Sequence, residues 1–130
     1  MRRITKEMIK IYGMSDIDWM GYKLENRQQF TYHHIVKKQY HGLDTISNGA
    51  ILIGETSHNY IHVIESRELD MFVYLNRILK EINNSSKMPT KTELLKIYDC
   101  LLKFERDHCS DVNRFNEPLI KEDYTKRIIL

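Results

Sequence analysis

Five of the six histidines of this 130-residue chain fall within residues 31–65. Imidazole binds transition metals and exchanges protons near neutral pH, so a cluster this dense indicates a metal site, a proton-transfer site or both. Residues four apart share one face of a helix, so His58 and His62 can point at the same ion. The five histidines are His33, His34, His41, His58 and His62.

The adjacent pair His33 and His34 is expected to have two different roles. Neighbouring residues of a strand point to opposite sides, so one imidazole can complete a metal site while the other remains free to move a proton. Three protein ligands leave a coordination position for water or substrate, which is a catalytic arrangement. Lys37 and Lys38 directly follow the strand expected to carry this pair, and they can contact a phosphate.

These side chains must be positioned by a strand, a loop, a second strand and a helix. Residues 30–36 mix aromatic, β-branched and polar side chains, and residues 50–53 form a short apolar run. Both patterns are typical of strands. Gly54 then breaks the second strand, and Thr56 or Ser57 can cap a helix. The expected elements are a strand at 30–36, a loop at 37–47, a strand at 50–53 and a helix through Glu65.

Helices are expected on both sides of this unit. A short helix is predicted from Thr5, as its cap, to Tyr12, with Gly13 ending it, and residues 14–26 are expected to be irregular. Apolar residues at helical spacing after Ser66 predict a further helix, followed by a polar linker at residues 83–89. Thr90–Glu93 forms a capping box for a last helix. The tail after Cys109 is expected to be irregular.

Composition places the chain among soluble globular proteins, with 42% hydrophobic and 29% charged residues. The sequence contains no apolar run of about 18 residues and no signal peptide, so no membrane association is expected. Cys100 and Cys109 form no Cys-x-x-Cys pair, which favours a reduced, cytoplasmic setting. A net charge of +2 neither requires nor excludes a nucleic-acid partner.

The pattern His-His-Ile, then Asn48, then His-x-x-x-His resembles the HNH endonucleases, whose core is the ββα-metal fold. The histidine-rich motif is most similar to that of colicin DNases, and short phage and prophage members are similar in size. The resemblance covers Phe30 to Glu65, about a quarter of the chain. Two departures stand out: the Cys-x-x-Cys pairs of many relatives are missing, and His41-Gly42 replaces a frequent Gly-Gly.

The resemblance implies a role for each matching residue. His33, His58 and His62 would be metal ligands, and His34 would be the general base that activates water. Asn48 would hold the loop between the strands and so keep His34 in place. The resemblance also implies an α+β fold whose ββα-metal core, residues 30–65, follows a lead-in at 1–29 and precedes a helical scaffold at 66–130.

The function expected from residues and resemblance together is metal-dependent hydrolysis of DNA, with products that carry a 5′ phosphate and a 3′ hydroxyl. The cofactor would be one divalent ion, and histidine ligands suit zinc, nickel, cobalt or manganese better than magnesium. Two alternatives stay open: a non-cleaving binder of DNA or protein on the same fold, and a structural zinc module. Pairing of two copies is also open. His41 and His108 are expected to have no role in the site.

Overall fold

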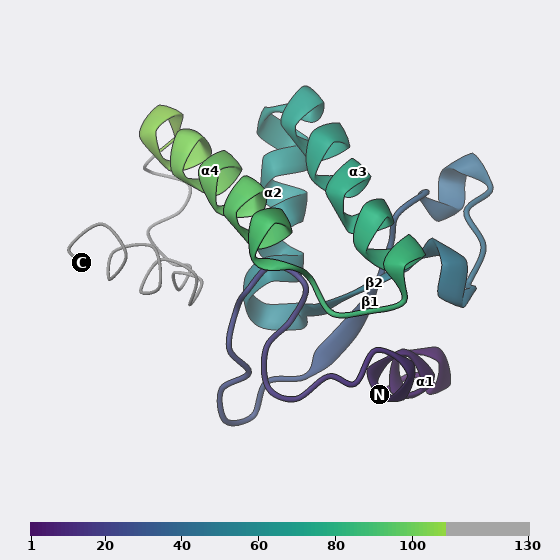
Figure 1. The fold of residues 1–130 in the computed structure, drawn as a ribbon. Coiled ribbons are helices and arrows are strands. Elements are labelled where there is room, and N and C mark those ends of the chain that lie inside the picture. The colour runs from purple at the N-terminus through teal and green to yellow at the C-terminus, as the bar shows by residue number, and fades with distance from the viewer. Residues whose placement is uncertain (109–130) are drawn as a thin grey trace.

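The computed structural model describes residues 1–108, in which four α-helices surround a two-stranded antiparallel sheet (Figure 1). The predicted α+β class is confirmed, whereas the tail after Cys109 lies outside the described residues. Three short helical turns, Lys38–Tyr40, Ile46–Asn48 and Gly54–His58, join the larger elements. The larger elements are α1 (Arg3–Ile11), β1 (Phe30–His34), β2 (Gly49–Ile53), α2 (Asn59–Arg67), α3 (Leu69–Ser85) and α4 (Lys91–Asp107).

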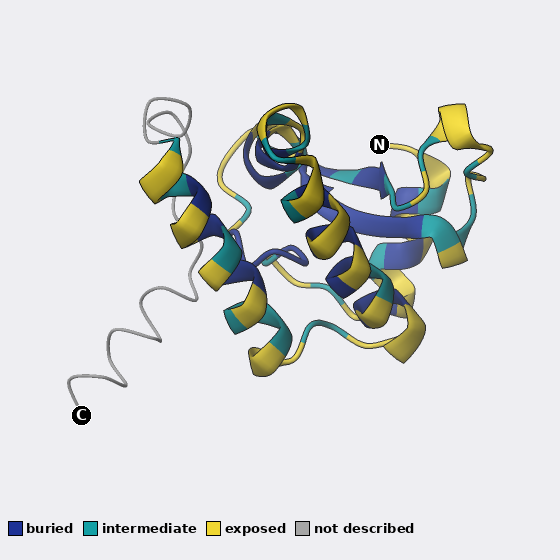
Figure 2. Cartoon of the chain, turned by 90° about the horizontal axis from the view of Figure 1, so that it is seen from above, coloured by how far each residue is buried: buried dark blue, intermediate teal, exposed yellow. Residues whose placement is uncertain are grey.

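The two strands pair so that Phe30 lies opposite Ile53 and His34 opposite Gly49. Every residue of β2 is buried, because α1 packs on one face of the sheet and α3 on the other (Figures 1 and 2). A Cβ atom at Gly49 would lie 2.3 Å from the Tyr32 ring and 2.8 Å from the Met8 sulfur. Gly49 therefore permits the close packing of α1 on β1.

The first strand ends two residues earlier than predicted. The amide of Ile35 donates to the Asn48 carbonyl (2.9 Å), and the Asn48 side chain hydrogen-bonds to both the amide and the carbonyl of Val36. The bond from Ile35 continues the register of the two strands, and the Asn48 side chain then replaces the strand pairing at Val36. The second strand begins one residue before the predicted Ala50 and ends at Ile53 as expected.

The predicted cap at Thr56 or Ser57 is wrong, because the chain enters α2 through a π-helical turn, Gly54–His58. The Ser57 hydroxyl instead donates to the carboxylate of Asp18, which is fully buried. The backbone amides of Met20, Tyr22 and Ile53 donate to the same carboxylate at 2.9–3.0 Å. Asp18 thus ties the irregular lead-in to the turn that carries His58.

The start of α1 and the end of α3 also differ from the prediction. Helix α1 begins at Arg3, and the predicted cap Thr5 is a buried residue inside its first turn. Gly13 follows the end of the helix with φ +63°, as expected. The polar segment predicted as a linker starts too early, since α3 continues to Ser85. Asn83 is buried there and donates to the carbonyls of Ile46 (2.6 Å) and Gly49 (2.7 Å).

The two long helices complete one hydrophobic core with the sheet. The capping box at Thr90 and Glu93 is present, as predicted, and starts α4. The predicted lead-in contributes Trp19, Met20 and Tyr22 to the same core. Within residues 1–108, no helix is both long and apolar enough to span a membrane.

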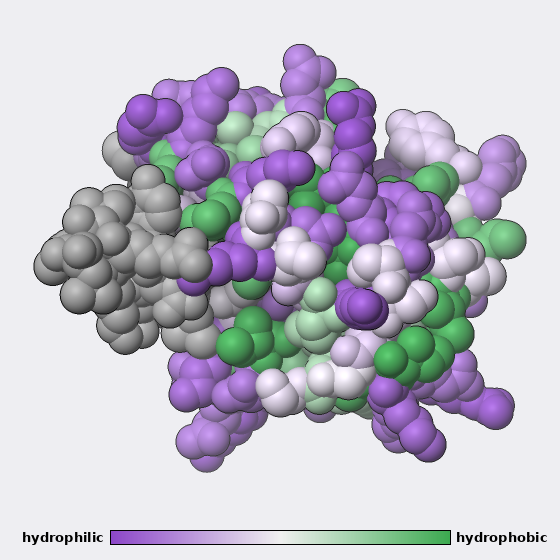
Figure 3. Space-filling model, viewed as in Figure 1, coloured by the Kyte–Doolittle hydropathy of each residue, from purple (hydrophilic) through white to green (hydrophobic). Residues whose placement is uncertain are grey.

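The predicted apolar stripes of α3 and α4 are mostly buried. Leu69 and Val73 are the exceptions, since they are 61% and 50% exposed near the start of α3, and Leu94 is half-buried. On the face of the molecule in Figure 3, hydrophilic side chains predominate and hydrophobic ones appear in small groups. The buried members of the predicted stripes are Phe72, Ile78, Leu79, Ile97 and Leu101.

Candidate metal centre

His33, His58 and His62 lie together, although they come from β1, the π-helical turn and α2. One ring nitrogen of each lies within 4.8 Å of those of the other two. The ring centroids are 5.3 Å (His33–His58), 5.6 Å (His33–His62) and 5.1 Å (His58–His62) apart. Three imidazoles at this separation can bind one metal ion, as the residue spacing predicted.

Hydrogen bonds fix the tautomer of His58. The Thr31 hydroxyl donates its single proton to the Leu52 carbonyl (2.8 Å). The same oxygen lies 2.7 Å from His58 Nδ1, so it must accept a proton from that nitrogen. The lone pair of His58 is therefore on Nε2, which remains available to a metal.

The other two histidines are held in the same manner. His33 Nε2 lies 2.8 Å from Asn76 Oδ1, and His62 Nδ1 lies 3.0 Å from Glu65 Oε1. Both oxygens are acceptors, so each of these nitrogens carries the proton and the opposite ring nitrogen keeps its lone pair. Partners of this kind orient metal-binding histidines and make them better ligands. The donor set therefore fits a bound transition metal.

Burial keeps the imidazoles of His33 and His58 neutral. His33 is 1% exposed, and burial, with a smaller effect of the neighbouring imidazoles, lowers its pKa to about 3. Burial and the nearby His62 and His34 lower the pKa of His58 to about 4. A neutral imidazole is the form that binds metal, so these two side chains are available to an ion at neutral pH.

His34 points to the other side of β1 and has different partners. Its Nε2 is hydrogen-bonded to the Asp44 carboxylate, whose second oxygen accepts from Arg2 at 2.8 Å. The hydrogen bond from His34 lowers the pKa of Asp44, so the carboxylate is ionised and accepts the proton. The free lone pair of His34 is therefore on Nδ1.

Asn48 closes the loop between the strands with three hydrogen bonds. Its Oδ1 accepts from the Val36 amide (2.8 Å), and its Nδ2 donates to the carbonyls of Val36 (3.0 Å) and Leu43 (2.9 Å). The segment held in this way begins two residues after His34 and ends one residue before Asp44. This geometry agrees with the loop-holding role expected for Asn48.

A hollow of about 240 Å³, called here the histidine cavity, opens onto these groups. Lys37 and Lys38 both line it, but their surroundings differ. The Lys37 ammonium is paired with Glu65, the carboxylate that holds His62. Lys38 is exposed and is the better placed of the two to meet an anionic ligand. The cavity is lined by Tyr32, His33, His34, Lys37, Lys38, Gln39, His58 and His62.

Four residues that support these histidines were missed from the sequence. Glu65 had a usable signal, because it lies three residues after His62 on the same helix. Thr31, Asp44 and Asn76 had none, since each meets its histidine only through the tertiary fold. His41 is exposed in the loop, and His108 bonds Glu68 at 2.9 Å away from the histidine cavity. Neither joins the site, in agreement with the expectation.

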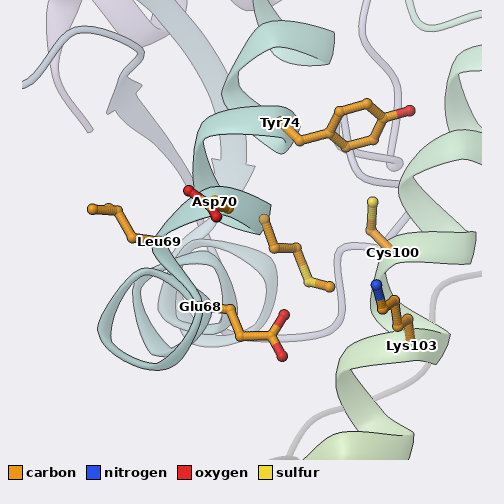
Figure 4. A pocket seen from close by; sticks show the side chains of 7 residues that line it. Glu68, Leu69, Asp70, Tyr74, Cys100 and Lys103 are labelled. Carbon is orange, nitrogen blue, oxygen red and sulfur yellow. The ribbon is translucent and has the colours of Figure 1, made fainter.

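A larger hollow of about 530 Å³ lies between α3 and α4. Figure 4 shows Tyr74 of α3 opposite Cys100 and Lys103 of α4. Burial raises the pKa of the Cys100 thiol to about 11, so the thiol stays protonated at neutral pH and is a poor ligand or nucleophile. The larger hollow therefore offers no group suited to metal binding or nucleophilic attack at neutral pH, whereas the three histidines that could hold an ion line the smaller histidine cavity.

Comparison with known proteins adds no assignment. The chain matches no protein-family model, no curated protein and no solved structure. The case for a function therefore depends on the geometry of the histidine cavity.

Proposed function

We propose that this chain is a metal-dependent DNA endonuclease of the HNH type. The observation that carries the proposal is the pairing of three imidazoles that can hold one ion with a fourth, His34, that lines the same cavity from the other side of β1. In the described residues the metal-binding group consists of His33, His58 and His62. Such a set leaves a position for water or substrate, which argues against a purely structural zinc site.

His34 is the general base in this proposal. Asp44 holds the proton on Nε2, so Nδ1 can take a proton from a water molecule in the histidine cavity. Asn48 fixes the loop that carries Asp44, and Lys38 attracts the phosphate. A divalent ion held by the three other histidines would stabilise negative charge that develops on the phosphate oxygens. Zinc, nickel, cobalt and manganese suit three nitrogen ligands better than magnesium does.

A plasmid-nicking assay with a metal titration tests the proposal. The parent protein should convert supercoiled DNA to the nicked form in at least one of manganese, nickel, cobalt, zinc or magnesium, and a chelator should stop the reaction. Ends that carry a 5′ phosphate and a 3′ hydroxyl are expected. If no metal supports nicking, the nuclease proposal fails.

The second candidate function is a non-cleaving binder of DNA or protein. The observation that favours it is a group of exposed hydrophobic side chains beside the histidine cavity, including Tyr40 (66% exposed) and Leu69 (61%). Exposed apolar groups of this kind often mark a binding surface. Stable DNA binding without nicking in any metal would favour this candidate.

A further inference from the structure

A mainly apolar hollow lies next to the histidine cavity, between the segment after β1 and the helices α2 and α3. It encloses about 410 Å³ and is called here the apolar hollow. Phe72 is a buried part of its lining, and large exposed side chains stand around it. The exposed ones are Tyr40 (66% exposed), Leu69 (61%), Val73 (50%) and Val36 (48%).

The two hollows are continuous in their lining. Lys37 belongs to both, and the polar lining of the apolar hollow is completed by Glu65 and Asn76. These two residues hold His62 and His33 respectively. The two hollows therefore adjoin each other at Lys37, and a ligand in the histidine cavity lies next to the apolar hollow.

Nucleic acid matches this arrangement, because each anionic phosphate of its backbone is followed by a flat, largely apolar base. The exposed ammonium of Lys38 is suited to the phosphate, and an exposed aromatic ring is suited to a base. We propose that the apolar hollow, with Tyr40 as its stacking residue, is a subsite for an unpaired DNA base next to the phosphate in the histidine cavity. The inference rests on the proposed function and defines its substrate class.

The substrate class follows from the position of bases in DNA. Bases of an intact duplex are paired and stacked on each other, so they enter a protein hollow only after leaving the stack. The chain is therefore expected to prefer single-stranded, branched or locally opened DNA. An apolar partner protein or a second copy of the chain would fill the hollow without using the adjoining cations and histidines.

Fluorescence anisotropy with labelled oligonucleotides tests the subsite, with a chelator present so that no cleavage occurs. The parent should bind a single strand more tightly than a duplex. Tyr40→Ala should weaken single-strand binding about tenfold, since stacking on one aromatic side chain accounts for such a factor. Tyr40→Phe keeps the ring and should bind like the parent. Tyr74→Ala, a tyrosine that is 39% exposed and lies outside the apolar hollow, is the matched control.

A strand of the same length whose sugars carry no bases separates stacking from backbone contact. Parent and Tyr40→Ala should bind this strand equally. An equal loss on both strands, an unchanged affinity of Tyr40→Ala for the normal strand, or a parent that binds no DNA would each overturn the subsite. Sedimentation that shows a dimer lost in Tyr40→Ala would also overturn it and assign the hollow to self-association.

Nicking is measured separately, so the two proposals can fail independently. Tyr40-dependent binding without nicking would remove the nuclease proposal and support the subsite. Nicking by a protein whose single-strand binding ignores Tyr40 would support the nuclease and overturn the subsite.

Discussion

The two faces of β1 place adjacent histidines in opposite environments. His33 faces α2 and α3, is almost fully buried and has a polar partner from α3. His34 faces the loop, its side chain is 22% exposed, and its partner Asp44 is also paired with Arg2. Strand alternation thus gives two identical side chains different surroundings, one buried and neutral and the other partly open to solvent.

The contrast between His33 and His34 shows that residue type alone does not determine the chemical role of a histidine. On the buried face, polar side chains from three elements fix which nitrogen of each histidine is free. On the loop face, a single ionised carboxylate does so. Metal binding and proton transfer should therefore respond separately to substitution.

The largest expected effect comes from His34, the proposed general base. His34→Ala should reduce DNA cleavage by about 10²–10⁴-fold, as expected for loss of a general base, and should leave metal affinity largely unchanged. His62→Ala should reduce metal affinity and cleavage together, with partial recovery at high metal concentration. His41→Ala, an exposed histidine of the loop, is the control and should behave like the parent. Cleavage by His34→Ala at the parental rate would show that the base is another group.

Much of this division was predictable from the sequence, because it depends on two local periodicities. Alternation along residues 30–34 separates His33 from His34, and helical spacing brings His58 and His62 together. The β2 boundaries and the Thr90 capping box are equally local, and both were predicted to within one residue. The grouping of His33 with His58 and His62 also agrees with the structure, but the choice of His33 rather than His34 came from the family resemblance and not from these periodicities.

The partners of the histidines could not be predicted, because they depend on contacts between distant residues. Asn76 reaches His33 only when α3 packs against the sheet, and Asp44 reaches His34 only when the loop closes on Asn48. The π-helical turn was missed for a similar reason. Ser57 resembles a helix cap in sequence, yet its hydroxyl is used by the buried Asp18 from the lead-in.

The second prediction tests the buried face. Asn76→Leu should lower zinc affinity about 10–100-fold, because it removes the acceptor that orients His33. Asn76→Asp keeps an oxygen at this position and should retain most of the affinity. Competition with a chromophoric chelator measures the constants, and Asn84→Leu, an exposed position on the same helix, is the control. An unchanged affinity in Asn76→Leu would mean that packing alone orients His33.

The third prediction concerns pH. The pKa values of His33 and His58 are lowered to about 3 and 4 in the fold, so below about pH 6.5 the unfolded chain binds protons that the folded chain does not. The free energy of unfolding of the metal-free protein should therefore fall as pH falls from 6.5. Each histidine accounts for at most about 2 kcal/mol by about pH 5.

Asp18 acts in the opposite direction. Burial raises its pKa to about 6, so between about pH 4 and 6 the folded chain holds the extra proton and acidification stabilises it. Because two histidines act against one carboxyl group, the free energy of unfolding should still fall overall on acidification. Urea unfolding across this range should give a shallower slope for His58→Asn than for the parent. Equal slopes would indicate that His58 does not stay neutral in the fold.

The smallest effect is expected on the loop face. Asp44→Ala removes the acceptor that keeps the proton on His34 Nε2, so a fraction of the imidazoles would carry it on Nδ1 and lose the ability to accept a proton from water. Cleavage should fall about tenfold, less than in His34→Ala, because the imidazole itself remains. Asp44→Asn keeps an oxygen that can accept the bond and should lose less activity. Asp99→Ala, an exposed acidic position on α4, is the control, and single-turnover rates at saturating metal give the comparison.

A loss of metal affinity in Asp44→Ala equal to its loss of rate would contradict the separation of the two faces, because it would connect the loop carboxylate to the buried histidines through β1.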